Sequence, residues 1–160
     1  MMQPIEELRY LILAAQREGN RLFADTLQPL DLTPSQAEVL RVLQDHEPLS
    51  LIALGEHLVC ETGSPSRLVQ GLVADGLVER VPSATDKRMV TLTLTTAGRE
   101  KAANVQAIEA QVYEATASLA QNPHLPEVIE LLWYFVKDKP AGMALARRIA
   151  RETDDSVTVD

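Results

Sequence analysis

The chain has few of the residues that dedicated chemistry often needs: one cysteine, six aromatic residues and three histidines among 160 residues. The lone Cys60 forms no internal disulfide and cannot supply the several thiolates of a structural zinc site. So few aromatic rings argue against binding single-stranded nucleic acid on stacking platforms. No apolar run approaches the roughly 20 residues that span a membrane, and the start lacks the pattern of a signal peptide. We therefore expect a cytoplasmic protein with no membrane partner.

Common catalytic motifs are also missing from the sequence. It contains no glycine-rich phosphate loop, no H-E-x-x-H zinc motif and no G-x-S-x-G nucleophile motif. The three histidines fall in separate segments, and no motif pairs any of them with a nucleophile. We therefore predict a protein that is not an enzyme and that needs no cofactor.

Charge is unevenly distributed along the chain. The net charge is −8, but the residues between 61 and 101 carry a net +1, while the segments on either side are acidic. A hydrophobic content of 46% is typical of one globular domain with a proper core. Because a phosphate backbone attracts basic groups, any contact with nucleic acid should lie between 61 and 101.

Apolar residues at helical spacing dominate the first sixty positions. The stripe Ile5, Leu8, Ile12 and Ala15 predicts an amphipathic helix that ends at Leu27-Gln28-Pro29. A second helix should begin at Thr33-Pro34, where Gln36 completes a capping box. Ser50 should cap a short third helix. A fourth should begin at Thr62 or Ser64, because Pro65 fits only a first turn, and end at a left-handed Gly76.

The apolar period then changes from 3.6 to 2, which predicts a β-hairpin with strands at 77–81 and 89–94. Thr95 or Thr96 should cap a long helix that Asn122-Pro123 ends. Its apolar residues are spaced 3, 4, 3 and 4 apart, a coiled-coil-like stripe that we expect to be buried partly against a partner chain: Val105, Ile108, Val112, Ala115 and Leu119. Further helices are expected at 125–136 and 142–151.

The segments around the fourth helix and the hairpin carry a recognisable pattern. Ser64 to Val69 is followed by Gly76-Leu77-Val78-Glu79-Arg80, and the hairpin contains Asp86-Lys87-Arg88 before Leu94-Thr95 and Gly98. This combination resembles the MarR family of transcriptional regulators over roughly residues 5–120. Beyond 122 the chain departs from the family, which usually closes with one dimer helix where this chain has two pieces.

The order of elements and the resemblance together predict a mainly α fold with a small β-hairpin wing, a winged helix-turn-helix with a helical dimerisation layer. We expect the winged DNA-binding domain over 32–95, the helical layer from 5–28 and 96–152, and a frayed tail over 153–160.

The resemblance and the helix-turn-helix arrangement indicate which residues contact DNA. The first turn of a recognition helix faces base edges in the major groove, where arginine can bind guanine and glutamine can read adenine. A cation at the hairpin tip can enter a minor groove. Ser64 could instead serve only as a helix cap, Gln70 only as a surface residue, and Asp86 is expected to fix the shape of the wing. The predicted contacts are Ser64, Pro65, Ser66, Arg67, Gln70, Asp86, Lys87 and Arg88.

We therefore predict a homodimeric regulator that binds an inverted repeat in double-stranded DNA, most simply as a repressor. The resemblance implies that a small phenolic or anionic ligand binds between the helical layer and the winged domain and releases the DNA. Arg9, Arg17 and Arg21 could pair with such an anion, although a solvated helix face explains them equally well.

Two alternatives come from other classes of function. Winged domains can bind proteins, and a net charge of −8 suits that use. The chain could also be a metal- or redox-sensing regulator that uses Cys60. His57 lies three residues before Cys60, a spacing that can bind a metal on a helix. For redox sensing, the neighbouring Glu61 does not favour the reactive thiolate form of the cysteine. The aromatic run Trp133-Tyr134-Phe135 is expected to pack in a dimer core rather than hold a ligand.

Overall fold

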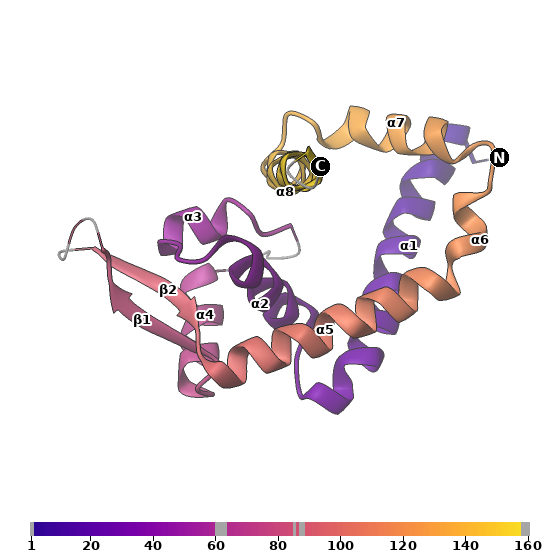
Figure 1. Ribbon diagram of the computed structural model, residues 1–160. Helices are drawn as coiled ribbons and strands as arrows, with labels where there is room; N and C mark the ends of the chain where they lie inside the picture. The colour runs from indigo at the N-terminus through magenta and orange to yellow at the C-terminus, as the bar shows by residue number, and fades with distance from the viewer. Residues whose placement is uncertain (1, 60–63, 85, 87–88, 158–160) are drawn as a thin grey trace.

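A computed structural model describes residues 2–59, 64–84, 86 and 89–157 and has a mainly helical fold with one β-hairpin. The hairpin projects from one end of the molecule, and α7 crosses the top at the other (Figure 1). The elements in chain order are α1 (Pro4–Leu27), the 3-10 turn η1 (Gln28–Leu30), α2 (Pro34–His46), α3 (Leu51–Gly55), α4 (Pro65–Ala74), β1 (Val78–Pro82), β2 (Val90–Leu94), α5 (Thr96–Ala115), α6 (Ala117–Ala120), α7 (Leu125–Val136) and α8 (Pro140–Val157).

Capping bonds confirm the predicted starts of α2, α3 and α5. Thr33 Oγ1 accepts a hydrogen bond from the Gln36 N–H, and Gln36 Oε1 accepts from the Thr33 N–H, so the capping box is complete. Ser50 Oγ accepts from the Ala53 N–H at the start of α3, and Thr95 Oγ1 accepts from the Gly98 N–H at the start of α5. These bonds satisfy backbone donors that have no partner within a helix.

The hairpin is antiparallel, with Val78 opposite Leu94 and Pro82 opposite Val90. Gly76 has φ 69°, the left-handed conformation expected after α4, and the chain turns there into β1. A feature that the sequence analysis did not predict is an antiparallel bridge between Leu49 and Leu92, with backbone bonds of 3.2 and 2.7 Å. The segment before α3 therefore pairs with the hairpin.

One core joins the expected winged region to the expected helical layer. Val39, Leu40 and Leu72 are fully buried within the winged region, and Leu27 and Val105 pack in the same cluster from α1 and α5. Burial of these apolar side chains stabilises the winged region and also the contact of α1 and α5 with it.

The long helix and the C-terminal helix differ from their predicted bounds. The long helix is interrupted at Thr116, whose Oγ1 donates to the carbonyl oxygens of Val112 at 2.9 Å and Tyr113 at 3.2 Å. Such local side-chain bonds compete with regular helical bonding, so Leu119 of the stripe lies on α6. Helix α8 begins at Pro140 and runs to Val157, past the expected end at 151 and into the expected tail, because no glycine or proline interrupts it after Gly142.

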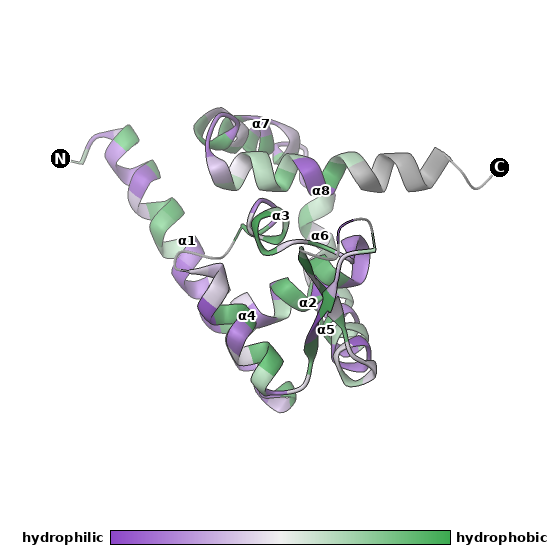
Figure 2. Ribbon diagram, turned by 90° about the vertical axis from the view of Figure 1, so that its left-hand side faces the viewer, coloured by the Kyte–Doolittle hydropathy of each residue, from purple (hydrophilic) through white to green (hydrophobic). Residues whose placement is uncertain are grey.

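Helices α1, α5, α6 and α7 form an open layer beside the winged region (Figure 1). Hydrophobic and hydrophilic residues alternate along α1 (Figure 2). Burial falls along the predicted stripe: Val105 is fully buried, Ile108 and Val112 are half-buried, and Leu119 is 59% exposed. Within the described part of the chain, no helix has both the length and the apolar character to cross a membrane.

Candidate nucleic-acid interface

Helix α4 turns a polar face to solvent and an apolar face to the core. Val69 and Leu72 are buried, while Ser66, Arg67 and Gln70 are exposed. Positions three and four apart share one face of a helix, so the arginine and the glutamine lie one turn apart on the outer surface. This arrangement offers a charged donor and an amide from one exposed strip.

The start of α4 leaves its serine hydroxyl available. The Ser64 carbonyl accepts the N–H groups of Arg67 at 3.0 Å and Leu68 at 3.4 Å, but its side chain makes no capping hydrogen bond. A helix N-terminus with orphan N–H groups attracts anions such as phosphate. Pro65 is half-buried at the first helical position, where it lies beside Gly55 of α3 and fits the start of the helix.

The described part of the hairpin tip is closed by backbone bonds. The Met89 N–H donates to the Asp86 carbonyl at 2.9 Å, and the Ser83 N–H donates to the Met89 carbonyl at 2.8 Å. Asp86 is exposed beside this turn. The other two predicted wing contacts, Lys87 and Arg88, lie outside the described residues.

The hairpin also presents a cation that the prediction of contacts did not include. Arg80 is exposed on β1, within the segment of positive net charge. Arg80 stands between Glu79 and Val81 and belongs to the family pattern, but only its charge indicated a contact.

A carboxylate at the end of α2 fixes the hairpin to the helices. Glu47 Oε2 accepts the Leu94 N–H at 2.6 Å, and Oε1 accepts a hydrogen bond from Arg99 Nη1 on α5. The Glu47 side chain therefore bonds β2 and α5 together and adds to the Leu49–Leu92 bridge in holding the wing. Bonds to an ionised acceptor are among the stronger ones in proteins.

A cavity of about 460 Å³ lies between α1, α2, α5 and α8. Its volume falls in the range of small-molecule sites. Aromatic, amide and charged side chains line it, and they include Gln16, Asn20, Phe23, Glu38, Glu109, Val112, Tyr113 and Arg148.

Both carboxylates of this cavity are paired with arginines. Glu109 accepts from Arg41 Nε at 3.0 Å, and Glu38 accepts from Arg148 Nη1 at 3.0 Å. The sequence analysis did not predict either pair, because the partners are 68 and 110 residues apart. The α1 arginines that it proposed for an anion lie elsewhere: Arg21 pairs with Glu18 on the surface.

Within the described part of the chain, no group of three or more His, Cys, Asp or Glu could hold a metal ion. His57 Nδ1 lies 2.8 Å from the Ala53 carbonyl oxygen, and its ring packs against that of His46. Cys60, Glu61 and Thr62 lie outside the described residues.

Comparisons with known proteins agree with this geometry. A model of the MarR family matches residues 30–89. The multiple antibiotic resistance protein MarR of Escherichia coli K12 is 34% identical over 98 residues, which cover 61% of this chain and 68% of that protein.

Solved structures of related regulators share the fold. A cysteine-to-serine mutant of E. coli MarR, in complex with operator DNA, is 29% identical and superposes with a TM-score of 0.66, covering 83% of this chain and 94% of that one. Bordetella bronchiseptica BpsR, whose DNA binding is regulated by 6-hydroxynicotinic acid, has a TM-score of 0.70 at 23% identity, with coverage of 86% and 98%.

Proposed function

Because the chain belongs to the MarR family of transcriptional regulators, we propose that it is a dimeric repressor that binds a specific duplex sequence and releases it when a small molecule binds. The related proteins are regulators, so the chain is a regulator and not an enzyme. The observation that carries the proposal is the exposed polar strip of α4 beside a projecting wing. A protein acting on promoters would work in the cytoplasm, where it has access to the chromosome.

In the proposed complex, the first turn of α4 enters the major groove. Arg67 pairs with a guanine edge, Gln70 reads an adenine, and the serine hydroxyls bind phosphates or bases. The wing contributes Lys87 and Arg88 to the phosphates or the minor groove, and Asp86 holds its shape. The positive end of the α4 helix dipole favours a phosphate there.

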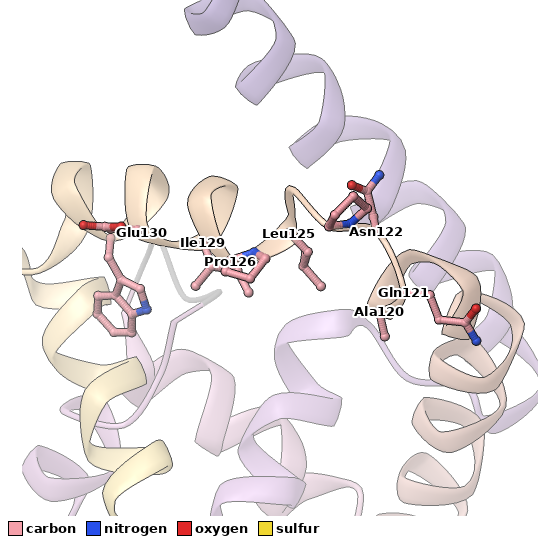
Figure 3. A pocket seen from close by; sticks show the side chains of 9 residues that line it. Ala120, Gln121, Asn122, Leu125, Pro126, Ile129 and Glu130 are labelled. Carbon is pink, nitrogen blue, oxygen red and sulfur yellow. The ribbon is translucent and has the colours of Figure 1, made fainter.

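Two copies of the chain are needed to cover the apolar surface of the helical layer. In Figure 3, Leu125, Pro126 and Ile129 point to one side of α7, where they line a groove of about 710 Å³. Apolar side chains exposed on several helices of one layer indicate a partner, and a closed two-fold dimer is the simplest. The exposed large apolar residues of the layer include Ile5, Leu11, Leu22, Leu119, Val128, Ile129, Leu131, Leu132, Tyr134 and Phe135.

A two-fold dimer with one recognition helix per subunit implies an inverted repeat with half-site centres about 10 bp apart. Affinity selection of random duplexes by the purified protein should return such a repeat, and the affinity should fall steeply with added salt. Selection of a single unrepeated motif would contradict the dimeric arrangement. Failure to select any duplex would favour the protein-interaction alternative.

We propose the cavity between α1, α2, α5 and α8 as the site of the releasing ligand. It joins the helical layer to the winged region, so an occupant contacts both. Phe23 and Tyr113 suit an aromatic ring, and the Arg148 guanidinium suits a carboxylate or phenolate.

The ligand site is tested with aromatic acids on the protein–operator complex. Benzoate or 6-hydroxynicotinic acid should lower the anisotropy of a labelled operator, and uncharged benzamide should have less effect. Val112→Trp fills the cavity from α5 without changing charge, so it should keep operator binding and lose the response. A response that survives in this variant would place the ligand elsewhere.

A further inference from the structure

The Glu38 carboxylate lies at the meeting point of three segments. Its side chain is only 6% exposed, and Oε1 accepts both the Val59 N–H at 2.8 Å and the Arg148 Nη1 at 3.0 Å. A buried carboxylate stays charged at little cost only where a cation and hydrogen-bond donors surround it. Helix α8 supplies the cation, and the backbone after α3 supplies a donor.

Val59 is the last described residue before the connection into α4, five positions ahead of Ser64. Leu58 beside it is buried in the core. Helix α8 makes a second bond to the same segment, because Arg147 Nη1 donates to the Glu56 carbonyl at 2.8 Å. The Arg147 bond lies at the exposed surface, whereas the Arg148 bond ends on the buried Glu38 carboxylate, so the contact through Glu38 is the one that holds the backbone leading to the recognition helix.

The direction of α8 is itself fixed by close packing against α7. A Cβ on Gly142 would lie 1.9 Å from the Val136 carbonyl oxygen, so only glycine permits this turn. Ala144, one turn before Arg148, is 1% exposed. A displacement of α8 therefore has to be transmitted to the Arg148 guanidinium in the middle of that helix.

We propose that Arg148 is a positioning residue for DNA recognition: through Glu38 it ties α8 to the entry of α4 and so holds the recognition helix where it can meet the operator. The positioning role of Arg148 rests on the proposed function, because the experiment that tests it measures operator affinity. Arg148 touches no DNA in this scheme, and its effect requires both the ion pair from Arg148 to Glu38 and the bond from the Val59 N–H to Glu38.

The test compares Arg148→Met with Arg147→Met, an adjacent variant with the same loss of charge. Arg148→Met should weaken operator binding roughly tenfold or more, and should speed hydrogen exchange at the Val59 amide by a similar factor. Arg147→Met, whose bond lies at the exposed surface, should stay within about twofold on both measures. Arg148→Lys keeps a cation and should recover most of the affinity.

A double variant separates positioning from simple charge neutralisation. Glu38→Gln with Arg148→Met leaves no buried charge and retains an acceptor for Val59, so it should melt near the parent temperature and protect the Val59 amide. Its operator affinity should remain roughly tenfold low, because α8 is no longer tied.

Recovery of affinity in the double variant, or parent-like affinity in Arg148→Met, would overturn the proposal. Failure of the proposed function and failure of the positioning role can be told apart. A parent protein that binds no operator refutes the proposed function, while hydrogen exchange at the Val59 amide in Arg148→Met still tests whether Arg148 holds this segment.

Discussion

Gly98 lies in the first turn of α5 against the backbone of Leu77, just before β1, and Gly98→Ala should destabilise the fold. A Cβ at this position would lie 1.9 Å from the Leu77 carbonyl oxygen, 3.0 Å from its carbonyl carbon and 3.4 Å from its Cα. Ordinary contact begins near 3.4 Å, so the two backbones would have to separate by about 1.5 Å. Rotation of a flexible side chain cannot relieve this clash, because all three atoms belong to the main chain.

The cost can be assembled from the bonds at this contact. The Leu77 carbonyl accepts the Thr95 N–H at 3.1 Å and the Thr95 hydroxyl at 3.3 Å, and separation weakens both. Two hydrogen bonds contribute about 1 kcal/mol each, and overpacking adds about 1–3 kcal/mol. The higher helix propensity of alanine returns about 1 kcal/mol. The net expectation is a loss of about 2–4 kcal/mol in the free energy of unfolding.

Denaturant and thermal unfolding followed by circular dichroism measure this loss, at one fixed protein concentration. Gly71→Ala is the matched control: it is also a helical glycine, but nothing lies within 4 Å of the added Cβ, so it should be neutral or stabilise by up to about 1 kcal/mol. If Gly98→Ala unfolds within about 0.5 kcal/mol of the parent, the close approach of α5 to Leu77 is wrong.

Three further predictions concern the cap, the DNA contacts and the dimer. Thr33→Ala removes one half of the capping box and should cost about 1 kcal/mol, read by chemical denaturation, whereas Ser35→Ala should change little. Arg67→Ala should cost roughly 1–3 kcal/mol per half-site and relax base preference at one position, while Arg88→Ala should weaken all sequences more evenly and flatten the salt dependence; anisotropy titrations across a salt series separate them, and identical salt slopes would refute the assignment. Ile129→Glu on the exposed face of α7 should shift sedimentation from dimer to monomer at micromolar concentration, and an unchanged dimer would exclude that face from the interface.

Local signals in the sequence were sufficient for most of the fold. Capping residues such as Thr33 and Ser50 bond to groups only three positions away, and the left-handed conformation of Gly76 depends on the turn at the end of one helix. The helix starts and this helix end could therefore be predicted without tertiary structure. The switch of apolar period likewise located the hairpin to within one residue at each strand start.

Contacts between distant segments could not be predicted in the same way. The bridge from Leu49 to Leu92 and the ion pair from Glu38 to Arg148 depend on how the helices pack, and no spacing along the chain encodes them. The break at Thr116 was missed because threonine is tolerated within helices unless its hydroxyl bonds back to the preceding turn. For the candidate site, the exposed strip of α4 followed from periodicity, whereas the cavity and its paired carboxylates did not.

Helix α5 spans the junction between the core and the open layer, and its length has a mechanical consequence. Its first turns are fixed at Gly98 and Val105, and its twenty residues reach roughly 30 Å at 1.5 Å per residue. A tilt of about 10° at the fixed end moves the far end by roughly 5 Å, more than the approximately 3.4 Å rise of one base pair. In the proposed dimer, a rearrangement too small to disturb the core would therefore change the distance between the two recognition helices by more than one base-pair step.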